Sequence, residues 1–198
     1  MGDRPVWEIE EEMESHQQEG NVGAVMDLVD ELGNMQDKLF AAVVDGDLND
    51  ILYYESLGFD ITDSSYLKVA AQYGQCKIIE FLINQGSDAH AEVEEPLYVA
   101  CINNQLEAVR CLISKGAIVH AGIERAIKVS AENDFLDIVQ LLVASGSSIE
   151  AVLDIRNLAD YHKEVYKWAH AYKQAKDLKD GLEKNLDDGG LSARKAKV

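Results

Sequence analysis

The sequence predicts an all-α solenoid, in which stacked helix pairs lie between a helical cap at each end. One motif recurs four times, at intervals of 28, 30 and 30 residues, and in each copy an apolar segment lies 19 residues before a glycine. Within each copy the apolar residues follow helical spacing. A single copy cannot bury its apolar face, so the copies must stack. The 198-residue chain is 47% hydrophobic and has two prolines, which fits a folded domain and excludes a fibrous chain.

Residues 1–37 are expected to form an acidic N-terminal helical cap. The segment 19–33 resembles the second half of the motif and ends at Gly33, as the other copies end at a glycine. Trp7, Ile9 and Met13 lie at spacings that suit a helix before it. We therefore interpret residues 1–37 as a degenerate repeat.

Residues 38–149 contain the four copies, and the second copy shows how each is built. Residues 67–73 have the pattern of a first helix, Gly74 breaks it, and residues 77–84 have the pattern of a second helix. Gly86 then supplies a left-handed C-cap. The aligned apolar positions, which we expect in the core, are Leu48, Cys76, Leu106 and Leu136; Ile51, Ile79, Val109 and Val139; and Leu82, Leu112 and Leu142.

The third copy carries a resemblance to a known family. Glu95-Pro96-Leu97-Tyr98-Val99-Ala100 keeps the Pro, Leu and Ala of the T-P-L-H-x-A motif that opens an ankyrin repeat, and residues 104–117 match the second half of that repeat. Residues 38–149 therefore resemble ankyrin repeats. The spacing of 28–30 is shorter than the 33 of the family, which implies short or absent β-hairpin fingers and resembles ankyrin-like repeats of viral, phage and protozoan proteins.

The resemblance implies a binding module whose partner docks on the concave face. The family's binding positions follow the small residues of each first helix and map to Val44-Asp45, Gln72-Tyr73, Ile102-Asn103 and Glu132-Asn133. Link residues Ser64, Glu94, Glu95 and Glu124 would line the same edge. Tyr73 and Ile102 suit an interface, since aromatic and apolar anchors contribute much binding energy.

Residues 150–182 are expected to form a C-terminal helical cap, because apolar residues recur at spacings of three and four. The alternative is that Tyr161, Val165, Trp168 and Tyr172 form a homodimer interface. Residues 183–198 have few apolar residues and are expected to be a disordered tail.

Charge indicates the kind of partner. The net charge is -18, and it divides into -10 for residues 1–37, -9 for 38–149 and +1 for 150–198. This charge disfavours direct binding to nucleic acid or to an anionic membrane and favours a partner protein with a basic surface. Glu8, Glu11 and Glu12 belong to a glutamate cluster whose charges repel one another, and a basic partner would relieve this repulsion. A solvated helix face explains the cluster equally well. We expect the acidic concave surface to dock on and inhibit a basic, nucleic-acid-handling protein. The alternative function is a structural scaffold that dimerises through the C-terminal aromatic helix.

Catalytic, cofactor and metal sites are not expected. Common hydrolase, metalloprotease and nucleotide-binding motifs are absent from the sequence. His90 and His120 recur in successive copies, but stacked helices are about 8–10 Å apart, too far for both imidazoles to share a metal. The cysteines Cys76, Cys101 and Cys111 occupy packing positions, which predicts buried free thiols in a reducing compartment. No signal-like or membrane-spanning segment is found, so we expect a cytoplasmic protein.

Overall fold

The structure is a computed structural model that describes residues 3–195, with side chains described for residues 3–122 and 124–184. This part of the chain is helical and contains no strand. The helices are α1 (Val6–Gln18), α2 (Val22–Asp45), α3 (Leu48–Ser56), α4 (Ser64–Gln72), α5 (Cys76–Gln85), α6 (Ala91–Ile102), α7 (Leu106–Ser114), α8 (Ala121–Glu132), α9 (Leu136–Ala144), α10 (Ile149–Leu153), α11 (Leu158–Tyr161) and α12 (Lys163–Lys195).

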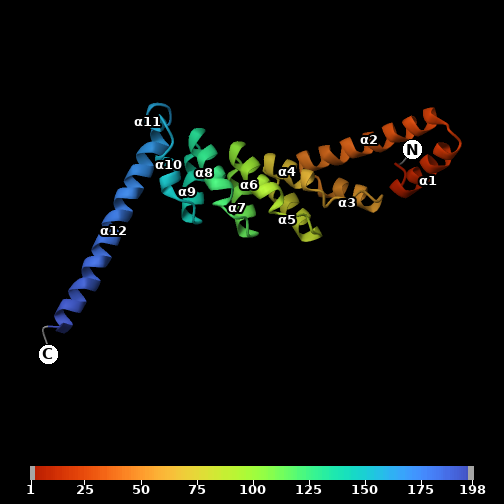
Figure 1. Ribbon diagram of the computed structural model, residues 1–198. Helices are drawn as coiled ribbons and strands as arrows, with labels where there is room; N and C mark the ends of the chain where they lie inside the picture. Colours follow the sequence, from red (N-terminus) through yellow and green to blue (C-terminus); the bar gives the residue numbers. More distant parts are fainter. Residues whose placement is uncertain (1–2, 196–198) are drawn as a thin grey trace.

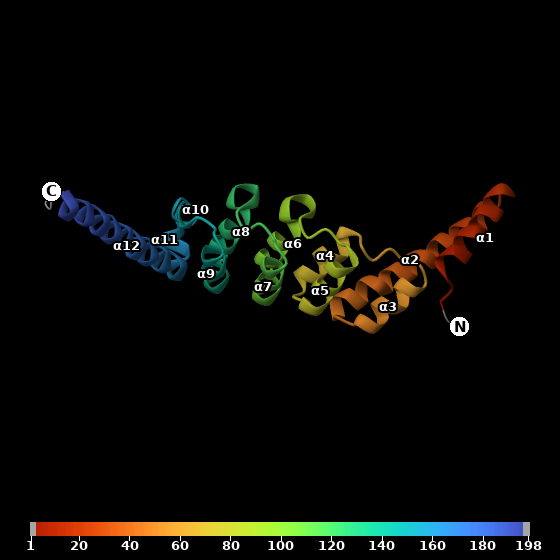
Figure 2. The same cartoon turned by 90° about the horizontal axis from the view of Figure 1, so that it is seen from below.

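The helices form an elongated stack of two rows (Figures 1 and 2). The first row consists of the C-terminal part of α2 and then α4, α6, α8 and α10, each in contact with the next. The second row begins with α3 and continues with α5, α7 and α9, which contact one another in order. The helix pair α1–α2 lies at one end, and α12 leaves the other end at an angle. The predicted all-α solenoid is confirmed, and in place of hairpin fingers the links are turns.

Local sequence ends each helix at the same place in each copy. The first helices stop where a left-handed residue follows, which is Gly46, Gly74, Asn104 or Asp134. The second helices of the last three copies end in a turn that bonds the N–H of Ser87, Ala117 or Ser147 to a carbonyl of the preceding helix, each at 3.0 Å. These repeated caps fix the angle between the helices of each pair.

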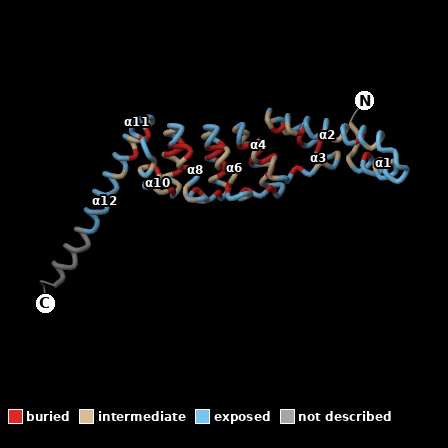
Figure 3. The backbone as a smooth tube through the Cα atoms, turned by 45° about the horizontal axis from the view of Figure 1, so that its top comes forward, coloured by how far each residue is buried: buried red, intermediate tan, exposed pale blue. Residues whose placement is uncertain are grey.

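The core lies between the two rows (Figure 3). Leu67, Leu97 and Ile127 from the first helices are fully buried, as are the aligned second-helix residues Ile51, Ile79, Val109 and Val139 and Leu82, Leu112 and Leu142. The other aligned set, Leu48, Cys76, Leu106 and Leu136, is only partly buried and packs against the core from its edge. The predicted core is otherwise confirmed.

The N-terminal end differs from the predicted repeat. Gly33 does not cap a helix but lies inside α2, which runs without a break into the first copy and ends at Gly46. The reason is an apolar series at spacings of four and three that crosses Gly33: Leu28, Leu32, Met35, Leu39 and Ala42. A continuous buried stripe outweighs the propensity cost of about 1 kcal/mol for one interior glycine.

The C-terminal end also differs from the expected arrangement. The apolar pattern is divided between α11 and α12, which are separated at His162, and Val165 and Ala169 of α12 are buried against the stack. The sequence predicts a disordered tail over 183–198, but α12 stays helical to Lys195, and 196–198 lie outside the described residues. Once the packed first turns nucleate a helix, each further residue extends it at little cost.

None of the described helices is both long enough and apolar enough to cross a membrane.

Candidate protein-binding surface

The side of the first row that faces away from the second row forms a ladder of equivalent side chains, which we call the inner face. Each first helix contributes three residues at spacings of three and four. These residues are Ser65, Lys68 and Gln72 of α4; Glu95, Tyr98 and Ile102 of α6; and Arg125, Lys128 and Glu132 of α8. Repeat spacing places like positions side by side.

Neighbouring repeats are linked on the inner face by polar contacts. Arg125 Nη1 donates to Glu95 Oε2 at 2.6 Å, and the guanidinium carbon lies 3.4 Å from the centre of the Tyr98 ring. Lys68 Nζ donates to Glu92 Oε1 at 2.9 Å, and this hydrogen bond raises the pKa of the lysine. Beside Arg125 and Lys128 is a shallow hollow of about 370 Å³ that also includes Tyr98 and Glu132. An aromatic ring held by a cation at the edge of a hollow is a preorganised contact surface.

The inner face is of mixed charge, whereas an acidic concave surface was expected. Lys68, Arg125 and Lys128 lie on it beside Glu95 and Glu132. Sequence reasoning missed these cations because it considered only the helix ends and links. For Lys68 and Lys128 a signal was present in the repeat, since each follows the buried residue that opens the motif, as Tyr98 does.

The predicted binding positions at the ends of the first helices are brought together along one edge, which we call the turn row. It contains Asp45, Gln72, Tyr73, Ile102, Asn103, Glu132 and Asn133, all of which are exposed. Tyr73 is 48% exposed and Ile102 41% exposed, large fractions for apolar side chains on adjacent turns. Asn103 and Asn133 each donate through Nδ2 at 2.8 Å to the carbonyl four residues before, so these two amides also hold their own helix ends.

The link glutamates do not line the edge as predicted. Glu94 is buried, and its Oε1 bonds to Nδ1 of His90, which raises the pKa of that histidine. The cause is the backbone, since Glu92, Val93 and Glu94 all have positive φ and turn the carboxylate inward. Glu124 accepts from the Ser148 N–H at 3.2 Å and holds the next link. Of the predicted link acids, Glu95 is the one that reaches the inner face.

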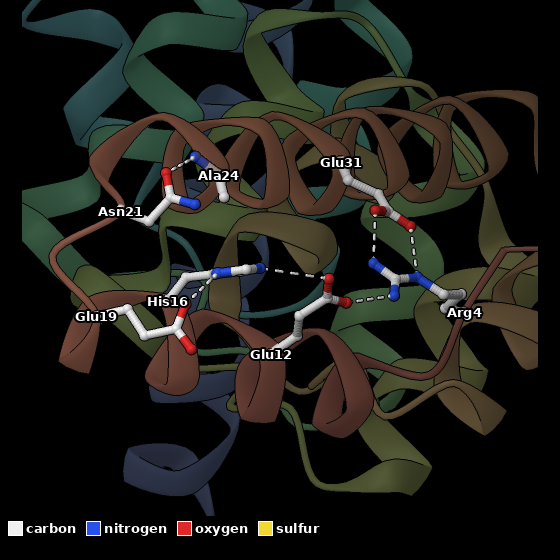
Figure 4. Close-up of polar contacts among 7 residues, drawn as sticks. All are labelled: Arg4, Glu12, His16, Glu19, Asn21, Ala24 and Glu31. Atoms are coloured by element: carbon white, nitrogen blue, oxygen red, sulfur yellow. Dashed lines mark hydrogen bonds and ion pairs between the residues drawn. The ribbon is translucent and has the colours of Figure 1, made fainter.

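The acidic cluster lies on α1, at the N-terminal end of the stack. Glu8 and Glu11 are exposed, and no ion pair of theirs occurs in the described part of the chain. Glu12 differs, because Arg4 donates to Glu12 at 2.6 Å and to Glu31 at 2.9 Å and so joins α1 to α2 (Figure 4). The hydrogen bond from Arg4 lowers the pKa of Glu12. Glu12 is therefore a structural residue, whereas Glu8 and Glu11 are free to meet a partner.

Comparison with known families identifies the middle of the stack. A family model described as ankyrin repeats, in three copies, matches residues 67–152. The match assigns ankyrin repeats to residues 67–152, which are less than half of the chain. The match includes most of α4, all of α5 to α9 and most of the short helix α10. It leaves the first copy, α1 and α12 outside. The comparison with curated proteins gives no match.

Ankyrin repeats bind other proteins, so the chain contains a protein–protein interaction module. The inner face and the turn row lie on the ankyrin repeats and their N-terminal neighbour, where the exposed Tyr73 and Ile102 have no role in the core. The surface can provide apolar anchors, a cation–aromatic contact and side chains of both charges.

The aromatic residues proposed for a homodimer do not form one exposed face beside the ankyrin repeats. Val165 is fully buried, and Trp168 is partly buried and stacks on Tyr172 at 5.2 Å between ring centres. Tyr161 and Tyr172 are exposed. Val165 and Trp168 therefore pack against the end of the stack, and further along α12 Leu178 and Leu182 are also exposed.

The three cysteine thiols are free and are buried or partly buried. Burial raises the pKa of Cys101 to about 12 and that of Cys111 to about 11, so both remain protonated at neutral pH. Cys76 is partly buried, and burial raises its pKa too. Among the described residues no three metal-ligating side chains come together.

Proposed function

We propose that this chain binds a nucleic-acid-handling protein through that protein's basic surface and thereby blocks it. The free glutamates of α1 would attract the partner, and the turn row with the inner face would hold it. The observation that carries the proposal is the separation of these two features: unpaired acids at one end, and exposed Tyr73 and Ile102 on the adjoining repeats.

Electrostatics supports this division of roles. Residues 1–37 carry a net charge of -10, and Glu8, Glu10, Glu11 and Glu14 are all exposed within two turns of α1. Like charges this close repel one another, and a basic surface would relieve that repulsion and speed the encounter. The inner face has both signs of charge and would contribute specificity more than attraction.

Substitution of the free glutamates tests the proposal. The variant Glu8→Gln/Glu11→Gln/Glu14→Gln would be compared with the native chain in affinity capture from a nuclease-treated lysate, at low and high salt. A matched control, Glu80→Gln/Glu107→Gln/Asp137→Asn, removes the same charge from exposed sites on the second row.

The native chain and the control should capture a basic nucleic-acid-binding protein at low salt. The α1 variant should associate at least about tenfold more slowly and with a weaker salt dependence. The captured protein should also lose nucleic-acid binding when the chain is added. Equal capture by the α1 variant would contradict steering by α1, and unchanged nucleic-acid binding in the complex would contradict the inhibitory role.

A further inference from the structure

Helix α2 carries an exposed apolar stripe that the core does not use. The α2 stripe consists of Val22, Met26 and Val29 with Gly33, at spacings of four, three and four residues. Val22 and Met26 are more than 60% exposed and Val29 about half exposed, while the buried residues of α2 lie on another side of the helix. Three large apolar side chains in a row on one helix face indicate a contact surface.

Helix α12 carries a second stripe with the same spacing. The α12 stripe consists of Ala171, Ala175, Leu178 and Leu182, again at four, three and four residues. All four residues are exposed, because α12 contacts the stack only through its first turns (Figure 3). Each stripe extends over twelve residues, or about 18 Å of helix, so the two match in length.

The charges beside the two stripes are opposite and lie at equivalent positions. Asp27 and Asp30 follow the start of the α2 stripe by five and eight residues, and Lys176 and Lys179 follow the start of the α12 stripe by the same numbers. All four side chains are exposed, and of these only Lys179 has an ion pair within the described residues, at 3.9 Å to Glu183. In an antiparallel helix pair the equivalent edges face each other, so lysines would lie along aspartates.

The two stripes cannot meet within one molecule. Helices α2 and α12 lie at opposite ends of the elongated stack, with the ankyrin repeats between them (Figures 1 and 2). The occupant of each stripe must therefore come from another molecule, and a second copy of this chain supplies the complement in spacing, length and charge.

We propose that α12 of one copy packs antiparallel on α2 of a second copy. The contact joins different surfaces of the two molecules, so it is a head-to-tail contact that forms a closed ring or an open chain. Pairing two α12 helices with each other is less favourable, because antiparallel packing would place Lys176 and Lys179 against the same lysines. This interface goes beyond the proposed function, since it uses neither the turn row nor the α1 glutamates.

The experiment uses two single substitutions in the full chain. Met26→Glu disrupts the α2 stripe and Leu178→Glu disrupts the α12 stripe, and both residues are exposed enough that the fold should persist. Leu52→Glu places the same charge on an exposed apolar site of α3 and serves as the control. Sedimentation velocity would be measured over a range of concentrations for each variant and for an equal mixture of the first two.

The native chain and Leu52→Glu should associate with increasing concentration, and each stripe variant alone should self-associate at least about tenfold more weakly. The mixture should recover a dimer and no larger species, because one variant retains α12 and the other retains α2. A monomeric native chain at every concentration would overturn the proposal. So would a mixture that stays monomeric, or a Met26→Glu variant that still associates, which would indicate pairing between α12 helices.

Charge reversal provides a second readout. Asp30→Lys should weaken association, and mixing it with Lys176→Asp should restore a dimer through the reversed pair, because antiparallel alignment of Val29 with Ala175 brings Asp30 closer to Lys176 than to Lys179. Failure of the two reversed variants to associate would contradict the antiparallel register.

Discussion

Replacing Gly46 by alanine tests how the turns of neighbouring repeats are held in place. Gly46 ends α2 with φ of +75°, in the left-handed region. The Gln75 side chain, from the next repeat, donates through Nε2 to the carbonyl of Val44 at 2.6 Å. This hydrogen bond ties the turn that carries Asp45 to the turn that carries Tyr73, so it helps to align the turn row.

The expected loss of stability has two parts. A left-handed alanine costs about 1–2 kcal/mol. Its Cβ would also lie 2.8 Å from Cδ of Gln75 and closer still to Oε1, so the amide must move and give up its hydrogen bond, which costs about 0.5–1.5 kcal/mol. Gly46→Ala should therefore reduce the free energy of unfolding by about 1.5–3.5 kcal/mol.

Urea unfolding measures this loss, with Gly20→Ala as the control. Gly20 has nearly the same φ, +72°, but a Cβ at this position would have no neighbouring atom within 4 Å, so only the backbone cost of about 1–2 kcal/mol should remain. The double variant Gly46→Ala/Gln75→Ala should cost less than the sum of its single substitutions, because both remove the same hydrogen bond. Equal costs for Gly46→Ala and Gly20→Ala, or strict additivity in the double variant, would show that Gln75 does not hold this turn in place.

Three further predictions concern the links and the C-terminal cap. Glu94 raises the pKa of His90 in the folded protein above its unfolded value of about 6.5. The stability that this pair contributes should therefore be complete below about pH 6.5 and be lost as pH rises through the folded pKa. His90→Gln should abolish this pH dependence of the free energy of unfolding. Val165→Ala should cost about 1–3 kcal/mol in urea unfolding by leaving a cavity under α12, and no loss would show that α12 is not packed there. The hydrogen bond from Lys173 lowers the pKa of Glu150 to about 2, so the stability that this pair contributes should be present above about pH 4.5 and be lost as pH falls toward 2. In an NMR titration, Lys173→Met should move the pKa of Glu150 upward. An unmoved pKa would exclude the pair.

The repeated part of the fold could be predicted because burial recurs at fixed spacing. Leu67, Leu97 and Ile127 occupy one position of three successive copies, and each is fully buried. The ends could not be predicted in the same way, since Gly33 has the spacing of a helix cap but lies within the continuous helix α2. The helix continues there because the apolar stripe that includes Leu28 and Met35 packs against the core. The recurrence of motif positions between repeats gives no information about this packing.

The candidate surface could be predicted in outline only. The turn row follows from repeat register, and Tyr73 and Ile102 are exposed as that register implies. The prediction that Glu94 lines the edge was wrong because three consecutive residues with positive φ turn its side chain inward. The residue types of this link do not predict such a conformation. Arg125 was missed because its contacts with Glu95 and Tyr98 depend on stacking between repeats and not on local sequence.

Site-specific crosslinking shows whether the turn row is a protein-binding surface. A photoreactive residue would replace Ile102 on the turn row and, in a second variant, Glu107 on the exposed side of α7 in the second row. The Ile102 variant should crosslink in lysate to a basic protein at low salt, and the product should be lost at high salt. The Glu107 variant should give no such product. Equal crosslinking from both positions, or crosslinking from the second row alone, would contradict it.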